Sequence, residues 1–246
     1  MRIKTISNYS PNFNSTKRRF NQLKFLIFHY TGMRSETEAI KRLTDFRSKV
    51  SSHYLIKNNG DIVLLVPDLY VAWHAGKSSW KNFKSLNDNS IGIEISNPGH
   101  EYNYKKYSIK QITSLIKLSK KLIKTYKIKK YNILGHSDIA PDRKMDPGEK
   151  FPWQQLATKG IGLWHSLSDK KLKDSRKLNI EFGQAEEKKF YKNLVKIGYP
   201  KIYYKNSKLK SSVIKAFQRH FRQELVNGKL DKECLIISEN IAKKFV

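Results

Sequence analysis

The chain has 246 residues, of which 39% are hydrophobic and 12% aromatic, so it can fill the core of one or two folded domains. This composition excludes wholesale disorder. The net charge of +28 predicts an acidic partner, which would be nucleic acid, an anionic membrane surface or a carboxylate-rich polymer. The alternative is that the lysines only cover solvated helix faces. A single cysteine, Cys234, excludes an intrachain disulfide and a cysteine-based zinc site.

No stretch of the sequence approaches the roughly 20 apolar residues that span a bilayer. The segment Met1–Phe20 is polar and basic, without the apolar run of a signal peptide. We therefore expect no transmembrane segment and a cytoplasmic location by default. Periplasmic location or secretion by another route is the alternative.

The first two thirds of the chain alternate between strand and helix patterns. Apolar or alternating runs predict strands, and capping signals followed by apolar positions at helical spacing predict helices. The expected elements are a strand over Leu23–Phe28, a helix from Ser35 through Phe46, a hairpin of residues 53–57 and 61–66 around Asn58-Asn59-Gly60, a strand over Ser90–Ser96, a helix opened by Ser108, and a strand over Tyr131–Leu134. This order predicts an α/β fold with a mixed central β-sheet flanked by helices.

The last third of the chain has helical patterns and a charged segment, and no strand pattern. A short helix begins at Phe151-Pro152-Trp153, and residues 166–177 are dense in Lys, Asp and Ser, which is typical of a linker. Three helical patterns follow, over residues 185–198, 208–221 and 230–245, and predict a small three-helix domain. The expected division is a catalytic domain over 1–165, a basic linker over 166–181 and a helical domain over 182–246.

Chemistry-bearing residues concentrate in one stretch, Gly135–Gly148. Pro141, Pro147 and Gly148 argue against a regular helix or central strand through it, so we expect a loop at the end of a buried strand. His136 and Asp146 are both suitable metal ligands, and one further histidine would complete a catalytic zinc site with an open position. His29 also follows a buried strand. Alone it would more often be a structural residue, but in combination with His136 and Asp146 it is the candidate third ligand.

Two further residues are candidates for the reaction itself. Glu94 lies in an otherwise apolar strand, where it is either a solvent-facing residue of an alternating pattern or a general base with a raised pKa. Lys144 lies two residues before Asp146 and could stabilise an oxyanion, although a loop lysine means little in so basic a chain.

Four motifs resemble the zinc N-acetylmuramoyl-L-alanine amidases of the AmpD/AmiD type, which share a fold with peptidoglycan-recognition proteins. They are His29-Tyr30-Thr31, Ala72-Trp73-His74-Ala75-Gly76, Ser90-Ile91-Gly92-Ile93-Glu94 and Gly135–Gly148. Phe151–Leu156, Gly160-Ile161-Gly162 and Ala216–Arg222 are most similar to the AmiD branch, the last of them to the helix of a peptidoglycan-binding-like module.

The resemblance implies that His29, His136 and Asp146 bind Zn²⁺, that Glu94 is the general base and that Lys144 stabilises the oxyanion. It implies cleavage of the amide between N-acetylmuramic acid, or its anhydro form, and L-alanine, with peptidoglycan or muropeptides as partners. Substrate contacts are expected from residues of the motifs and the aromatic segment beside them: Tyr30, Trp73, His74 and Trp80. For these aromatic residues, packing within a loop is the alternative.

Two other readings of the sequence compete with an amidase. A non-catalytic peptidoglycan-recognition protein is disfavoured because all the expected ligands, Glu94 and Lys144 are present. Nucleic-acid binding is not expected, because no helix-turn-helix or aromatic-basic RNA motif accompanies the charge. The positive surface is better explained as steering the protein to an anionic wall, which predicts a rate that falls as salt rises.

Overall fold

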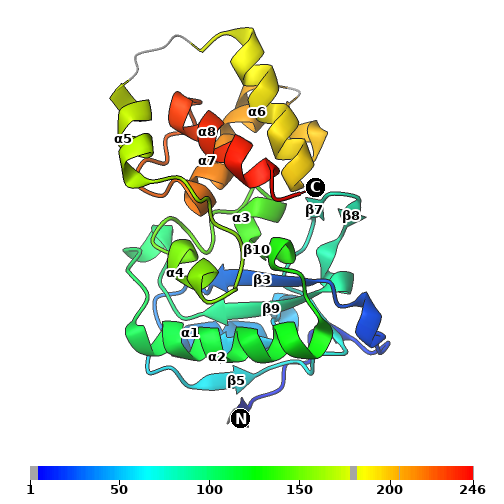
Figure 1. Ribbon diagram of the computed structural model, residues 1–246. Coiled ribbons are helices and arrows are strands. Elements are labelled where there is room, and N and C mark those ends of the chain that lie inside the picture. The colour runs from blue at the N-terminus through cyan, green and yellow to red at the C-terminus, as the bar shows by residue number, and fades with distance from the viewer. Residues whose placement is uncertain (1–4, 178–181, 205, 246) are drawn as a thin grey trace.

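The structure, a computed structural model, describes residues 5–177, 182–204 and 206–245. Its centre is a six-stranded sheet with the order β1-β5-β4-β9-β3-β10 (Figure 1). Neighbouring strands run parallel except β4 and β5, which form the predicted antiparallel hairpin. The sheet strands are β1 (Ile6–Ser7), β3 (Phe25–Tyr30), β4 (Tyr54–Ile56), β5 (Ile62–Leu64), β9 (Ser90–Ile95) and β10 (Ile133–Gly135). The mixed sheet confirms the predicted fold class.

Alternating side chains of β3 face two different hydrophobic clusters. Leu26 and Phe28 pack with the apolar stripe of helix α2 (Ile109–Tyr126), whose first turn is held by the predicted capping box of Ser108. Phe25 and Ile27 face the other way and belong to the cluster that contains the C-terminal helices. Helix α1 (Glu36–Thr44) packs around Leu55 of β4, on the same face of the sheet as Phe25 and Ile27. The sheet therefore has helices on both faces.

The C-terminal helices lie against the part of the chain that contains the central sheet, and the two share a hydrophobic core (Figure 1). They are α6 (Gln184–Ile197), α7 (Ser207–Phe221) and α8 (Lys232–Ala242), close to the three predicted ranges. Helix α5 (Asp169–Lys177) lies inside the stretch predicted to be a linker, and residues 178–181 of that stretch are outside the described residues. The division into domains stays a prediction.

Several elements differ from the expectation. The stretch Gly135–Gly148 is not entirely loop, because residues 136–139 form the one-turn helix α3 (His136–Ile139) before Pro141 stops it. Helix α1 ends at Thr44, and Phe46 belongs to a short 3₁₀ turn. Short strands that the sequence pattern did not predict pair in two small ribbons: β2 (Phe13–Asn14) with β6 (Val71–Ala72), and β7 (Ser79–Trp80) with β8 (Phe83–Lys84). Helix α4 (Trp153–Thr158) is the short helix expected after Pro152.

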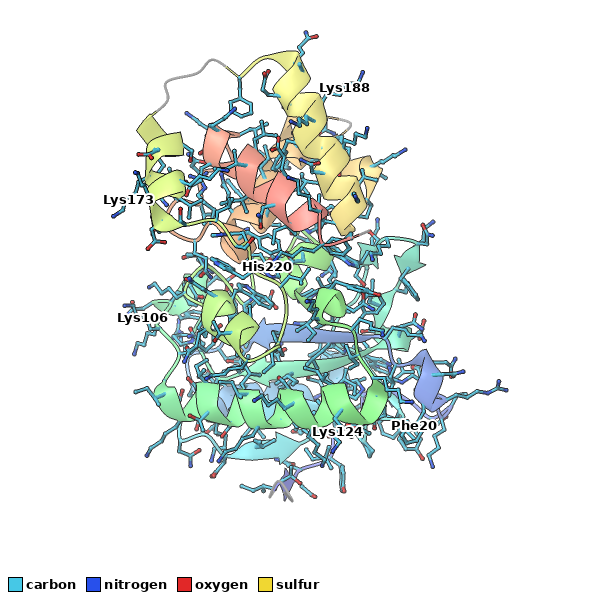
Figure 2. All side chains as sticks on the ribbon, viewed as in Figure 1. Phe20, Lys106, Lys124, Lys173, Lys188 and His220 are labelled. Carbon is cyan, nitrogen blue, oxygen red and sulfur yellow. The ribbon has the colours of Figure 1, made fainter. Side chains whose placement is uncertain are left out.

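The positive charge is spread over the molecule. Exposed lysines project from α2 and from α6 in different directions, as Lys124 and Lys188 show (Figure 2). This distribution agrees with lysines on solvated helix faces. Within the described part of the chain, no helix has the length and apolarity needed to cross a membrane.

Candidate active site

Strand register brings the predicted site residues together. His29 of β3 is the direct partner of Glu94 in the parallel strand β9. On the other side of β3, Phe28 is the partner of Gly135 in β10, so His136 follows immediately beside His29. Because all three strands are parallel, their carboxyl ends meet at the same edge of the sheet. Residues more than 100 positions apart thus converge there.

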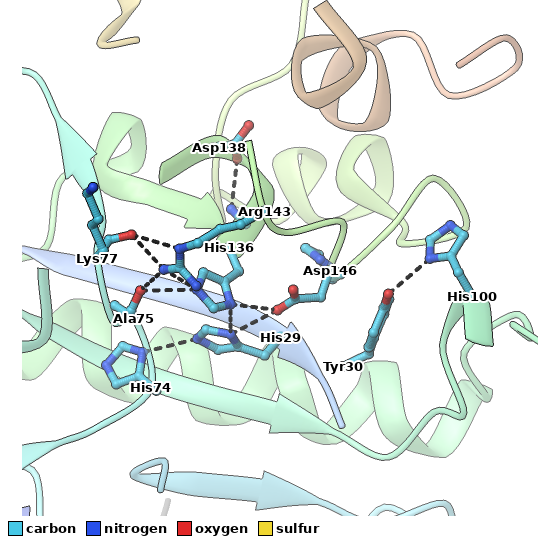
Figure 3. Close-up of polar contacts among 12 residues, drawn as sticks. His29, Tyr30, His74, Ala75, Lys77, His100, His136, Asp138, Arg143 and Asp146 are labelled. Atoms are coloured by element: carbon cyan, nitrogen blue, oxygen red, sulfur yellow. Dashed lines mark hydrogen bonds and ion pairs between the residues drawn. The ribbon is translucent and has the colours of Figure 1, made fainter. Parts of the chain in front are cut away.

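His29, His136 and Asp146 form a compact group of candidate metal ligands (Figure 3). The Nδ1 atoms of the two histidines are 3.0 Å apart, and Oδ2 of Asp146 lies 2.9 Å from Nδ1 of His29 and 3.0 Å from Nδ1 of His136. All three side chains are buried. Burial and the neighbouring His136 lower the pKa of His29 to about 4, so its imidazole is neutral at pH 7.

A chain of hydrogen bonds fixes the tautomer of His29. Ser90 Oγ donates to the carbonyl of Leu86 at 2.5 Å, so it accepts from Nε2 of His74 at 3.1 Å. His74 then carries its proton on Nε2, and its Nδ1 accepts from Nε2 of His29 at 3.0 Å. This order leaves the Nδ1 lone pair of His29 directed at Asp146 and His136. His74 therefore holds the ring of His29 in place.

A backbone carbonyl orients the imidazole of His136 through its Nε2 atom. Its Nε2 donates to the carbonyl oxygen of Ala75 at 3.2 Å, and this contact turns Nδ1 toward Asp146 and His29. Arg143 fixes that carbonyl, because its guanidinium donates to the oxygens of Ala75 at 2.5 Å and Lys77 at 2.6 Å. The segment around Ala75 is thereby tied to the loop that carries the ligands (Figure 3).

The donor set fits a metal cation. Two imidazole nitrogens and one carboxylate oxygen meet within about 3 Å of one another, so a cation at their centre would have three ligand atoms. Burial alone would raise the pKa of Asp146, but His136 and His29 hold it well below its usual value, so the carboxylate is ionised. A metal cation bound among these three atoms would offset the buried negative charge of Asp146.

Glu94 and Lys144 line the pocket that opens beside the three candidate ligands. Oε2 of Glu94 is buried and has no hydrogen-bond partner among the residues that the structure describes. Burial raises the pKa of Glu94 well above its usual value, and the charge of Asp146 raises it further, while Lys144 opposes the shift. An unpartnered carboxyl of this kind at a pocket wall is suited to accepting and releasing a proton.

The four aromatic residues predicted to contact substrate have three different environments. Tyr30 and Trp73 line the pocket, and Trp73 is oriented by a 2.8 Å hydrogen bond that its Nε1 donates to Asn14. His74 also borders the pocket, but both its ring nitrogens are engaged inside the protein. Trp80 does not line the pocket: it is 1% exposed and packs edge-on against Tyr199 in the core. We therefore remove Trp80 from the candidate substrate site.

Sequence reasoning missed several residues around the site. The Tyr30 hydroxyl is 3.0 Å from Nδ1 of His100, whose Nε2 is 3.0 Å from Glu149. Tyr30 and His100 line the pocket, and Glu149 holds His100 from behind. Burial alone would raise the pKa of Glu149, but the hydrogen bond from His100 lowers it. Arg143 lies within the predicted loop motif and Glu149 directly follows it, and these positions are the signal that could have identified them.

Comparison with known proteins agrees with this geometry. The family model described as N-acetylmuramoyl-L-alanine amidase (Amidase_2) matches residues 19–149. The amidase AmiD of Escherichia coli K12 is 38% identical over 244 residues, which cover 92% of this chain and 84% of AmiD. The chain belongs to the N-acetylmuramoyl-L-alanine amidase family.

Solved structures extend the similarity to nearly the whole molecule. The complex of E. coli AmiD with anhydro-N-acetylmuramic acid-L-Ala-D-γ-Glu-L-Lys superimposes with a TM-score of 0.81 at 35% identity, covering 94% of this chain and 93% of that one. AmpDh3 from Pseudomonas aeruginosa, in complex with an anhydromuramic pentapeptide, gives 0.80 at 32% identity, with 96% and 97% covered. The C-terminal helices are thus included in the shared architecture.

Proposed function

We propose that this protein hydrolyses the amide bond between N-acetylmuramic acid, or its anhydro form, and L-alanine, with a zinc ion bound by His29, His136 and Asp146. The observation that carries the proposal is the convergence of three buried acceptor atoms beside the unpartnered carboxyl of Glu94. Two imidazoles and one carboxylate, with a pocket on the open side, are a donor set typical of catalytic zinc. Bound zinc would polarise the scissile carbonyl as a Lewis acid.

Glu94 is the proposed proton carrier. It takes a proton from the attacking water as the oxygen of that water bonds to the carbonyl carbon. The same carboxyl then gives the proton to the alanine nitrogen as the carbon–nitrogen bond breaks, so that a carboxylic acid and a free amine leave the site. The raised pKa of Glu94 supports this role, because a carboxyl with such a pKa exchanges protons more readily near neutral pH.

Lys144 is the proposed electrostatic partner. It lines the same pocket as Glu94 and the ligands, and its ammonium group would stabilise the negative oxygen of the tetrahedral intermediate. Tyr30 and Trp73 are the proposed substrate contacts, since both line the pocket and offer aromatic surface to a sugar or a peptide. The anhydro-muramyl peptides bound by AmiD and AmpDh3 make anhydro-muropeptides the first substrates to test, in keeping with a role in cell-wall recycling.

The test combines metal content with product analysis. Purified protein is analysed for bound metal and then incubated with anhydro-muropeptides and with whole sacculi, before and after treatment with a chelator. We expect about one zinc per chain, free L-alanine-initiated peptides as product, and loss and recovery of activity on chelation and zinc addition. A zinc-loaded preparation that leaves both substrates intact would contradict the proposal. Binding of sacculi without cleavage would support a recognition protein instead.

A further inference from the structure

Asp138 is a buried carboxylate beside the metal ligands that the reaction does not use. It is 1% exposed and accepts three hydrogen bonds. One comes from the backbone N–H of Gly135 at 2.8 Å, and the other two come from the C-terminal part of the chain. They are the hydroxyl of Tyr199 at 2.6 Å and Nδ1 of His220 at 2.7 Å. The C-terminal helices thus reach the turn that carries His136.

Packing fixes both of these donors. The ring of His220 is stacked between Trp153, with centroids 3.8 Å apart and planes inclined by 13°, and Phe221 at 4.0 Å. Tyr199, which follows α6, is 1% exposed and packs against Trp80. Figure 2 shows His220 at the junction between the C-terminal helices and the catalytic part. Neither donor has freedom to turn away from Asp138 without disturbing the shared core.

The turn held by Asp138 positions two of the three proposed ligands. His136 directly follows Gly135, whose N–H is bonded to Asp138. The N–H of the next residue, Ser137, donates to the carbonyl oxygen of Asp146 at 2.8 Å. A displacement of this turn therefore moves His136 and also releases the backbone contact that places Asp146.

We propose that the C-terminal helices act as a brace for the metal site, with Tyr199 and His220 as positioning residues that act through Asp138. The inference rests on the proposed function, because it concerns the same metal ligands. It assigns to the helical part a task inside the enzyme, separate from any contact with the cell wall. Loss of either donor leaves a buried carboxylate short of a partner, and the turn must shift to satisfy it.

The experiment uses the full chain and three variants of the brace. Tyr199→Phe removes only the hydroxyl, His220→Leu removes the donor, and His220→Asn keeps an N–H near the position of Nδ1. Asn193→Ala is the control, because it removes a 3.0 Å hydrogen bond to Ser238 within the same helices without touching Asp138. Zinc affinity is measured by competition with a chelator, and the absorption spectrum of the Co²⁺-substituted protein reports the ligand geometry.

We expect Tyr199→Phe and His220→Leu to weaken zinc binding by 10- to 100-fold and to change the Co²⁺ spectrum. His220→Asn should recover most of the affinity, and Asn193→Ala should match the wild type in both measurements. Wild-type affinity and spectrum in Tyr199→Phe and His220→Leu would overturn the inference alone. If His220→Leu does not fold, Tyr199→Phe decides. A wild-type protein that takes up no zinc would overturn the proposed metal site and this inference with it.

Discussion

His29 and Glu94 are direct partners across the parallel strands β3 and β9, and their side chains lie on the same face of the sheet. This pairing places a candidate metal ligand beside the carboxyl that has no partner among the described residues. The flanking residues Ile93 and Ile95 point to the opposite face, into the cluster with helix α2. A one-residue shift of β9 would bury Glu94 in that cluster, so strand register is a condition for the proposed chemistry.

Glu94→Gln tests the proton carrier. The amide has nearly the same shape but cannot accept a proton, so we expect kcat to fall by about 10²- to 10⁴-fold. Zinc content should stay unchanged, because Glu94 is not among the proposed ligands. Glu101→Gln is the matched control, since Glu101 also lines the pocket but is exposed. Turnover of Glu94→Gln close to the wild-type rate would show that another group moves the proton.

Substitution of His74 tests the hydrogen-bond chain behind the proposed metal site. His74→Ala removes the acceptor that holds the tautomer and orientation of His29, and we expect zinc affinity to fall by about 10- to 100-fold. Gly92→Ala should act in the same direction, because a Cβ at Gly92 would lie 2.5 Å from Cγ of His74 and displace the ring. His165→Asn, outside the pocket lining, is the control. Unchanged zinc affinity in both site variants would show that His29 needs no such support.

Substitutions of Trp73 and Trp80 distinguish a role in substrate binding from a role in core packing. Trp73→Ala is expected to raise KM for muropeptides with little loss of stability, because Trp73 is partly exposed at the pocket. Trp80→Ala should instead lower the free energy of unfolding by about 3–5 kcal/mol, because it leaves a cavity in the core. Chemical denaturation and steady-state kinetics on both variants check this division. An increase in KM for Trp80→Ala without destabilisation would restore Trp80 to the substrate site.

The buried imidazole of His53 is expected to make the free energy of unfolding depend on pH. Its Nδ1 accepts from the N–H of Gly92 at 3.0 Å, and its Nε2 lies 2.8 Å from the guanidinium of Arg18. Burial, followed by the charge of Arg18, lowers the pKa of His53 from 6.5 to about 3. Between these values the unfolded chain binds a proton that the folded chain does not. Its contribution to stability is therefore complete above pH 6.5 and is lost as the pH falls toward 3.

The loss from His53 amounts to about 2 kcal/mol between pH 7 and pH 5. His53→Asn keeps an acceptor for Gly92 but does not titrate, so the free energy of unfolding of this variant should fall less over that range. Urea denaturation of the zinc-saturated proteins at both pH values measures the difference. Equal losses in wild type and variant would mean that His53 is not the responsible group.

Local sequence determined most of the secondary structure and the chemistry of the loop. A continuous apolar run predicted β3 and an alternating run predicted β9, and Ser108 with Gln111 predicted the start of α2, because these signals act over a few residues. The same short segment also contains both His136 and Asp146, so the sequence alone identifies them as candidate metal ligands. The sequence pattern does not predict helix α3, because Pro141 and Pro147 disfavour a helix through the stretch as a whole, although the turn at His136 precedes both.

Only the tertiary structure decided what lies beside the site. The tautomer of His29 depends on His74 and Ser90, and the exclusion of Trp80 depends on its packing against Tyr199 after α6. The link from His220 to Asp138 joins residues 82 positions apart. Such contacts arise when separately specified elements pack together, and no short-range pattern encodes which buried polar group will satisfy which. The sequence by itself therefore predicted the candidate reacting groups, and the packed fold decided which side chains hold them in place.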